Sequence, residues 1–449
     1  MDQDTSKQMV FTGIDGKKVT AAFEDVTVTS DFGAVLLREV DRKVGLIERL
    51  AGCIRDERVA HKVRHELPEM LRQRVYQICN GYEDANDCDS LRADPAFKVA
   101  VGRDPLNDAD LASQPSMSRL ENAVDKRDLL RMAYALVDQY MNSFAAEPTA
   151  VVLDMDPTAV ITYGDQQLRL FNAFEDEYCL MPFHLYDGVT GKLIAAVLRP
   201  GKTPTAAEII SILKRVIRRL RARWQNTILI FRADSHHTKP EVMNWLEDHG
   251  VQYVTGLGPN SRLDKMFETT INDARGRFAQ THQEIRLYAA EYYAAASWGE
   301  RARRVVCRVV VNINGCVDTR YVVTSFDQTG AKYLYEDVYC GRGNAELMIK
   351  DHKVGLRSDR CSCHDAAANQ FRLILSSAAY VLLHEIRHKY LQGTELARCQ
   401  FTTLRLKLLR IGARVEVLKT AVRFFLPAAF PMKEVFARVL AMLQVPCRT

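Results

Sequence analysis

The chain has 449 residues, of which 47% are hydrophobic, so it is long enough for roughly two to four domains with packed cores. It carries 61 Lys and Arg against 56 Asp and Glu, and this near balance excludes an intrinsically disordered or polyanionic chain. The end of the chain differs, because residues 355–449 hold 15 Lys or Arg and only 6 Asp or Glu. This basic region predicts an anionic partner, although Arg on solvated helices is a plainer explanation.

Cysteine usage and the first residues indicate the compartment. The eleven Cys are irregularly spaced and odd in number, which is typical of reduced thiols. Residues 1–11 show no basic-then-apolar signal pattern, and the apolar stretch 373–383 is too short to span a bilayer. We therefore expect a soluble cytoplasmic protein without a membrane partner. The run 361–364, Cys-Ser-Cys-His, lacks a second Cys/His pair, so it does not predict structural zinc.

The first third of the chain reads as mostly helical. Short strands are expected in residues 1–30, and apolar residues recur at helical spacing over 35–50 and 120–130. Residues 80–115 are rich in Asp, Asn, Pro and Gly, which predicts a long irregular connection. We treat residues 1–145 as a mostly helical N-terminal region.

The pattern changes near residue 149, and residues 146–390 read as an α/β domain. The predicted elements are, in order, strands at 150–153, 178–186 and 192–198, a helix at 205–223, a strand at 227–231, a helix at 240–249 and a strand at 251–255. The order β-β-β-α-β-α-β is typical of an RNase H-like domain. Period and spacing do not separate it from other α/β layouts.

A β-rich segment then interrupts this domain over residues 260–335. Three runs rich in Val, Tyr and Ile predict strands, at 285–293, 304–313 and 319–326, and Asn314-Gly315 predicts a type I′ turn between the last two. Helical patterns resume from about residue 341 to 391. The basic C-terminal region, 391–449, predicts a helix at 397–411, strand-like residues at 414–425 and a last helix after Pro431.

Acidic residues stand where predicted strands end. Asp154 and Asp156 close one buried strand, Asp234 closes another, and Glu346 lies on the late helical stretch. Carboxylates gathered in this way can hold two Mg²⁺ ions for phosphodiester chemistry, because Mg²⁺ prefers oxygen ligands. Each residue also has a plainer explanation, since Asp234 suits a helix N-cap and Glu346 suits an ion pair one turn away.

The residues around Glu346 resemble a known signature. Tyr339, Arg342, Glu346 and Lys353 have the spacing Y-2-R-3-E-6-K, which resembles the YREK signature of bacterial insertion-sequence DDE transposases. Four further blocks look similar to segments of that family: 112–122, 153–158, 198–201 and 232–235. The resemblance covers roughly residues 110–390. It implies an α/β, RNase H-like catalytic domain interrupted by the β-rich insertion, with helical N-terminal and C-terminal regions.

The resemblance also implies a catalytic and metal-ligating triad of Asp156, Asp234 and Glu346. Residues i and i+2 share a face of a strand, so alternation cannot choose between Asp154 and Asp156, and the family's D-x-T pattern favours Asp156. The implied cofactor is Mg²⁺, two ions per active site, with Mn²⁺ able to substitute.

Other residues are expected to contact DNA. Three belong to the signature and lie near the scissile phosphate in the family: Tyr339, Arg342 and Lys353. Trp298, with Arg301 and Arg304, is expected to stack on an unpaired base, although a half-buried Trp on a sheet edge is an equal alternative. His236 and His237 depart from the family pattern after Asp234, and either contacts the phosphate or is solvated near a helix N-cap.

The leading interpretation is a DNA transposase that cleaves the ends of an insertion sequence and joins the 3′-hydroxyl to target DNA. The alternatives are an RNase H-like nuclease without strand joining and a DNA-binding protein without catalysis. Its partners would be the terminal inverted repeats, target DNA and a second copy in a homodimer. Residues 1–145 and the basic C-terminal region would bind the DNA ends and hold the dimer together. The protein would act in the cytoplasm, at the bacterial nucleoid.

Overall fold

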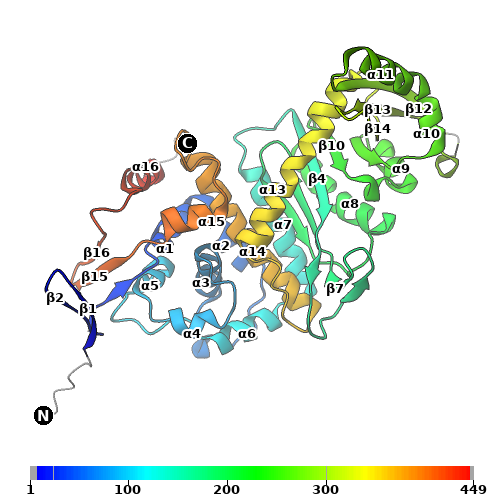
Figure 1. Cartoon of the computed structure of the whole chain (residues 1–449). Coiled ribbons are helices and arrows are strands. Elements are labelled where there is room, and N and C mark those ends of the chain that lie inside the picture. Colours follow the sequence, from blue (N-terminus) through cyan, green and yellow to red (C-terminus); the bar gives the residue numbers. More distant parts are fainter. Residues whose placement is uncertain (1–7, 24, 300, 445–449) are drawn as a thin grey trace, which may run out of the picture.

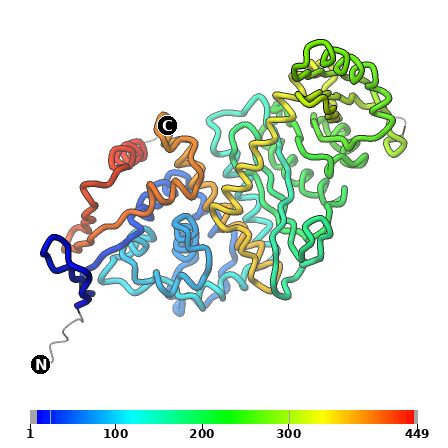
Figure 2. Tube along the Cα trace, in the orientation of Figure 1, coloured from blue at the N-terminus to red at the C-terminus, as the bar shows by residue number. Residues whose placement is uncertain are grey.

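The computed structural model of the protein describes residues 8–23, 25–299 and 301–444. Its elements form two lobes, one mainly helical and one built on a large β-sheet with helices on both sides (Figure 1). The C-terminal segment returns to the N-terminal helices, so the two ends of the described chain lie in the same lobe (Figure 2). Helix α14 (Ala366–Glu385) is buried over most of its length and contacts elements of both lobes.

The first lobe contains the helices of the N-terminal third. They are α1 (Gly33–Val44), α2 (Leu46–Ala51), α3 (Leu67–Asn80), α4 (Asp87–Leu91), α5 (Pro95–Val101), α6 (Gln114–Ala123) and α7 (Lys126–Asn142). Gly45 separates α1 from α2 because it adopts a left-handed conformation, with φ of 65°. The prediction of an irregular connection over residues 80–115 is wrong, since α4 and α5 lie there. Asp94 caps α5 through the backbone N–H groups of Ala96 and Phe97, a local signal that composition alone hides.

The C-terminal segment packs on the same lobe. α15 (Phe401–Leu404) continues into a π-helical turn (Arg405–Leu409) and is followed by β15 (Ala413–Leu418), β16 (Ala421–Phe425) and α16 (Lys433–Gln444). The strands at 414–425 and the last helix are confirmed, whereas the helix expected over 397–411 is shorter. β15 pairs with β3 (Val28–Thr29), which joins the end of the chain to its beginning. β1 (Met9–Ile14) and β2 (Lys17–Ala21) form a separate hairpin.

The second lobe is built on a sheet whose central five strands have the RNase H-like arrangement. These strands are β4 (Ala150–Pro157), β8 (Phe183–Asp187), β9 (Leu193–Val197), β10 (Ile228–Ala233) and β11 (Gln252–Leu257). Their spatial order is β9-β8-β4-β10-β11, with β4, β10 and β11 parallel and β8 antiparallel to both of its neighbours. Helices α8 (Ala206–Arg223) and α9 (Pro240–Asp248) confirm the predicted alternation. The fold class is therefore mixed α/β and RNase H-like.

The β-rich segment extends this same sheet. β12 (Ile285–Tyr293), β13 (Arg303–Val311) and β14 (Val317–Thr324) continue it in the order β12-β13-β14-β11. Two helices that the sequence analysis missed precede them, α10 (Ser261–Met266) and α11 (Glu268–Thr281). The prediction of a type I′ turn is wrong. Such a turn needs a positive φ at both central residues, and Gly315 has one but Asn314 does not. Instead Asn312 organises a longer connection, and its side-chain oxygen accepts from the N–H groups of Asn314 and Cys316.

A small second sheet interrupts the first hairpin of the lobe. It has the order β5-β7-β6 and comprises β5 (Val160–Ile161), β6 (Leu170–Asn172) and β7 (Glu177–Leu180). The run 178–186, predicted as one strand, is divided at Met181-Pro182 between β7 and β8. Proline lacks the N–H that a central strand needs, which explains the break.

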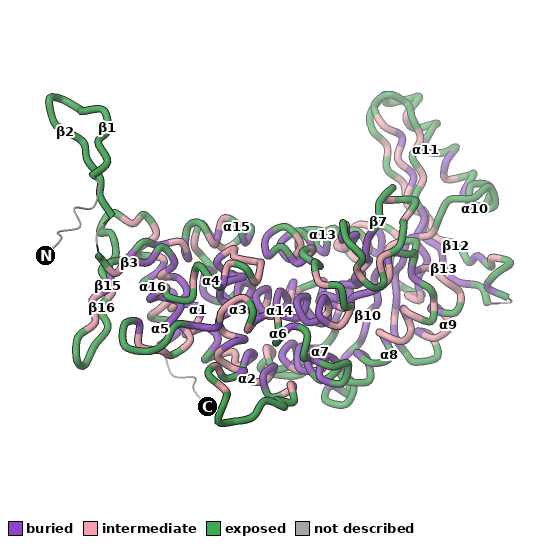
Figure 3. Tube along the Cα trace, turned by 90° about the horizontal axis from the view of Figure 1, so that it is seen from below, coloured by how far each residue is buried: buried purple, intermediate pink, exposed green. Residues whose placement is uncertain are grey.

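The two faces of the large sheet have different covers. Helices α7, α8 and α9 pack on one face through apolar residues, and α13 (Gly343–Lys350) lies on the other side of β10 (Figure 3). The chain reaches α13 through a short helix (Ala331–Tyr333), a π-helical stretch (Leu334–Tyr339) and a 3₁₀ turn (Cys340–Arg342), and it leaves through a π-helical turn (Asp351–Gly355). The side chains of Asp154 and Asp156 share the face of α13 and α14 with Tyr186 and His184, their partners on β8.

Candidate active site

Asp154 and Asp156 occupy the same face of β4 but differ in their partners. Asp154 is 1% exposed and accepts two hydrogen bonds from Arg232, from Nε to Oδ1 at 2.6 Å and from Nη2 to Oδ2 at 2.6 Å. This bidentate pair occupies both carboxylate oxygens. Asp156, two residues closer to the sheet edge, has one contact with a cation, from Arg342 Nη1 to Oδ2 at 3.2 Å. Only Asp156 therefore keeps an oxygen free for other chemistry.

Arg232 ties three parts of the lobe together. Besides Asp154 it donates from Nη1 to the carbonyl oxygen of Val338, at 2.5 Å, in the stretch that leads to α13. Glycines make room for this guanidinium, since a Cβ at Gly188 would lie 2.4 Å from Arg232 Nη2 and one at Gly341 would lie 2.6 Å from Nη1. The buried pair thus fixes the start of the α13 segment against β4 and β10.

Glu346 reaches the same edge from α13. Arg342 lies one turn before it and places its guanidinium between two carboxylates, 3.2 Å from Asp156 and 3.7 Å from Glu346 Oε1. Burial raises the pKa of Asp156 to about 6, and the negative charges of Asp234 and Glu346 act in the same direction against Arg342. Arg342 thus joins Asp156 of the sheet to Glu346 of α13, and Asp234 stands near enough to act on the pKa of Asp156.

Asp234 is held by the two histidines that follow it. It caps the 3₁₀ turn Ser235–His237, where its carboxylate accepts from the backbone N–H of His236 at 3.0 Å. The Nδ1 atoms of His237 and His236 lie 2.7 Å and 2.9 Å from its two oxygens. Burial would raise the pKa of Asp234, but hydrogen bonds and charge from His237 and His236 outweigh it and hold the pKa well below its usual range. The carboxylate is thus kept ionised.

The two histidines differ in exposure. His237 is fully buried between the rings of Phe183 and Phe231, whereas His236 is exposed. His237 therefore positions Asp234 from below the surface, and His236 stands at the surface beside the same carboxylate.

Tyr339 and Lys353 lie beside the carboxylates. A Cβ at Gly256 of β11 would lie 2.7 Å from the Tyr339 hydroxyl oxygen and 3.0 Å from the backbone nitrogen of Ser235, so this hydroxyl rests beside the residue after Asp234. Lys353 donates from Nζ to the carbonyl oxygen of Ala159 at 2.6 Å, three residues after Asp156. The four residues of the Y-R-E-K spacing thus border one edge of the sheet.

Trp298 lies away from that edge. Its side chain is 6% exposed, and its ring packs against Tyr293, with centroids 5.4 Å apart, and under the guanidinium of Arg303. Stacking on an unpaired base needs an open indole face, whereas this ring lies in the hydrophobic core of the lobe, closer to the alternative of a Trp packed at the sheet edge. Arg301 pairs with Glu247 of α9 at 3.2 Å. Arg304 donates to the carbonyl oxygen of Phe326 at 2.8 Å, so neither Arg brackets an open indole face.

The donor set suits hard divalent cations in its chemistry. Asp156, Asp234 and Glu346 offer oxygen atoms, the ligands that Mg²⁺ and Mn²⁺ prefer. Among the described residues, no group of three or more His, Cys, Asp or Glu side chains is already close enough to hold an ion. Arg342 lies between Asp156 and Glu346, which accounts for their separation.

No helix in the described part of the chain is long and apolar enough to cross a bilayer.

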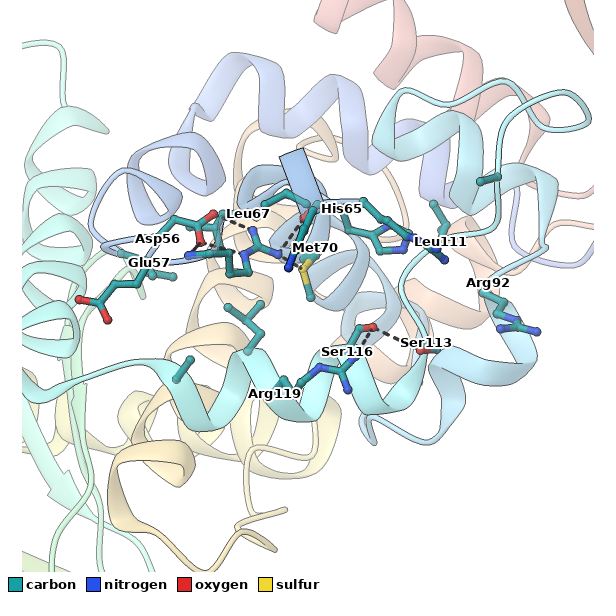
Figure 4. Close-up of a pocket in the computed structure, with 18 of the residues that line it drawn as sticks. Asp56, Glu57, His65, Leu67, Met70, Arg92, Leu111, Ser113, Ser116 and Arg119 are labelled. Atoms are coloured by element: carbon teal, nitrogen blue, oxygen red, sulfur yellow. Dashed lines mark hydrogen bonds and ion pairs between the residues drawn. The ribbon is translucent and has the colours of Figure 1, made fainter. Parts of the chain in front are cut away.

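A large hollow lies in the other lobe. It has a volume of about 1460 Å³ and is bordered by α3, α6 and residues 54–65 (Figure 4). Its cations are largely matched by acids, as in the pairs Arg58–Asp56 at 2.7 Å and Arg103–Glu69 at 2.9 Å. It contains none of the carboxylates of the sheet edge, so it is not the place where they act.

One comparison with known proteins identifies the family of the chain. The chain is similar to a solved piggyBac transposase, in a synaptic complex with hairpin DNA, with 11% identity and a TM-score of 0.41 over 85% of this chain and 80% of that one. A comparison with curated protein sequences gives no match. The family model described as "Transposase DDE domain group 1" matches residues 11–446, almost the whole length. The chain therefore belongs to this family of DDE transposases.

Proposed function

We propose that this transposase cuts DNA at the ends of a mobile element and joins the freed 3′-hydroxyl to target DNA, with Asp156, Asp234 and Glu346 as its catalytic carboxylates. The observation that carries the proposal is that Asp156 and Asp234 stand at the carboxyl ends of two adjacent parallel strands, while Arg342 lies between Asp156 and Glu346 of α13. Their neighbours supply cations and a hydroxyl for phosphate oxygens. The Y-R-E-K spacing supports the signature group of bacterial insertion sequences.

Each side chain has a task that follows from its surroundings. Asp234 stays ionised because two histidines hold it, and Asp156 is the weaker acid because it is buried beside other acids. Bound divalent metal ions would activate the attacking water or 3′-hydroxyl and stabilise the leaving oxygen. Arg342 and Lys353 would neutralise phosphate oxygens during both cleavage and joining.

The same site serves both steps. In cleavage an oxygen of water forms a bond to phosphorus and the bond to the 3′-oxygen breaks. In joining that 3′-oxygen attacks a target phosphodiester, and a target 3′-oxygen leaves. Two Mg²⁺ ions, replaceable by Mn²⁺, match the oxygen ligands. Because two element ends must be processed in one event, a homodimer is the simplest assembly.

The test is a cleavage assay on duplex DNA that carries the sequence flanking this gene, with Mg²⁺ and with EDTA. We expect wild type to nick at one position in a metal-dependent way and Glu346→Gln to be inactive. The matched control is Asp337→Asn, which removes an exposed carboxylate from the π-helical stretch that leads to α13 and should cleave normally. Equal cleavage by Glu346→Gln and wild type would contradict the triad.

The second candidate is a nuclease with the same site. Nothing in the carboxylate geometry separates the two, because hydrolysis and transesterification need the same ligands. A supercoiled plasmid added to the assay distinguishes them: covalent joining of a labelled 3′ end to the plasmid indicates a transposase, and cleavage without joining indicates the nuclease.

A further inference from the structure

Helix α8 presents a dense strip of positive charge on the side of the sheet away from the carboxylates. Residues 214–223 contain six Lys or Arg and no Asp or Glu. All six are exposed, and they are Lys214, Arg215, Arg218, Arg219, Arg221 and Arg223. The apolar residues of α8, such as Leu213 and Leu220, are buried against the sheet. The amphipathic packing of the helix therefore forces these cations together on its outer face.

Little of this charge is neutralised within the chain. Of the ion pairs among the described residues, one joins an α8 cation to a carboxylate, Arg219 to Asp138 of α7 at 2.6 Å. Arg221 and Arg223 donate to neutral groups, the carbonyl oxygen of Gly250 and the side chain of Asn142.

The remaining cations and the neighbouring acids confirm the imbalance. Arg215 bonds within its own helix, to Ser211, and the described residues give Lys214 and Arg218 no ion pair. Glu247, on the neighbouring helix α9, is already paired with Arg303 at 2.6 Å and with Arg301. The strip therefore carries positive charge that the chain itself does not neutralise, which favours binding of an anionic partner.

The position of the strip excludes a role at the reacting phosphate. β9 runs parallel to β4, so α8 begins near the edge that carries Asp156 and runs back toward the opposite edge. At 1.5 Å per residue, Lys214 and Arg223 lie about 12 and 25 Å along the helix from Ala206. Helix α8 also lies on the side of the sheet opposite α13 (Figure 3). An anion bound here is distant from the three carboxylates.

We infer that the outer face of α8 binds the backbone of duplex DNA outside the reaction centre, as a second DNA surface of the transposase. The inference rests on the proposed function, which supplies DNA as the anion. Six cations spread over about 14 Å of helix match a duplex, which carries one negative charge per roughly 1.7 Å. Arg and Lys without a base-reading partner predict binding that depends on salt and not on sequence.

The experiment compares wild type with the triple variant Lys214→Gln/Arg218→Gln/Arg215→Gln. None of these side chains holds another element, and Gln has a similar helix propensity. The matched control removes three exposed cations from α10 and α11, as Arg262→Gln/Lys265→Gln/Arg275→Gln. Binding to a random-sequence duplex is measured between 50 and 200 mM salt, together with oligomeric state and cleavage of a short element-end duplex.

Raising the salt concentration from 50 to 200 mM should weaken DNA binding less in the α8 variant than in wild type, by a factor of up to about 40. Each lost phosphate contact lowers the slope of log affinity against log salt concentration by about 0.9, and the variant lacks three cations. The control should keep the wild-type slope, and cleavage of the short duplex should stay within about twofold. An unchanged slope would overturn the inference, and a change in oligomeric state alone would assign the face to a protein partner and overturn it too. If wild type binds with the expected slope but never cleaves, the proposed function fails and the surface stands.

Discussion

Strand β4 carries two aspartates, two residues apart, that each pair with an arginine. One pair stabilises the fold, and we propose that the aspartate of the other takes part in the reaction. The inner pair, Asp154–Arg232, is buried and bidentate, with both distances at 2.6 Å. The outer pair, Asp156–Arg342, has one contact at 3.2 Å, and about a fifth of each side chain is exposed. Burial raises the pKa of both carboxyls to about 6, so pKa does not distinguish them. Their partners do.

The difference teaches how one strand can carry both stability and reactivity. A buried ion pair is costly to break, because the remaining charge is left without a partner. The inner pair is therefore suited to hold β4, β10 and the approach to α13 in register. The outer carboxylate is only partly satisfied and is surrounded by further acids, a state that favours a metal ion or a proton. The following predictions test this division.

The largest effect is expected for Asp156→Asn. Cleavage should fall by about 10³-fold or more, since the variant lacks a metal-ligating carboxylate. Without metal, the same variant should be more stable than wild type at neutral pH, by roughly 1–3 kcal/mol, because a raised pKa means that ionised Asp156 disfavours the fold. Single-turnover cleavage and urea unfolding in EDTA measure the two effects.

The stability difference between Asp156→Asn and wild type should depend on pH. Because the folded pKa of Asp156 is about 6 and its usual value is 3.8, the folded state binds the extra proton between these values. The stabilising contribution of this group is thus present at low pH and declines as the pH rises from about 4 to 6. The Asn variant should lack that decline. A variant that is inactive and also less stable in EDTA would contradict the division between the two aspartates.

The second effect concerns the inner pair. Asp154→Asn should lower the free energy of unfolding by about 3 kcal/mol, because leaving the buried Arg232 guanidinium without a counter-charge outweighs the relief of a carboxylate whose pKa is also raised by burial. Its cleavage rate per folded molecule should fall much less than that of Asp156→Asn. Urea denaturation and the rate normalised to folded protein test this. Asp138→Asn, at the exposed pair with Arg219, is the control and should change stability by less than about 1 kcal/mol.

Sequence patterns predicted the RNase H-like order of elements because buried strands and amphipathic helices each have a recognisable local spacing of apolar residues. They also singled out Glu346 and Asp234 as candidates, through a spacing signature and a strand end. They could not choose between Asp154 and Asp156 by physical reasoning, since the choice depends on Arg232, 78 residues away along the chain. The two alternatives for Trp298 could not be separated for a similar reason, because its burial depends on the packing of Tyr293 and Arg303 around the ring, which the local sequence does not reveal.

The smallest of these effects is expected for Arg342→Gln. The guanidinium supports Asp156 and Glu346 from one side, so its loss should reduce cleavage by about 10–100-fold, as for other residues that orient metal ligands. Arg342 lowers the pKa of Asp156 against the effect of burial, so the variant should move the acid limb of the pH–rate profile to higher pH. Single-turnover rates between pH 5 and 8 at saturating metal measure the shift. Arg320→Gln, an exposed Arg on β14, should leave the profile unchanged. A uniform loss of rate with an unmoved acid limb would mean that Arg342 contacts only the DNA phosphate, and the open outer pair would then have no part in setting the charge of Asp156.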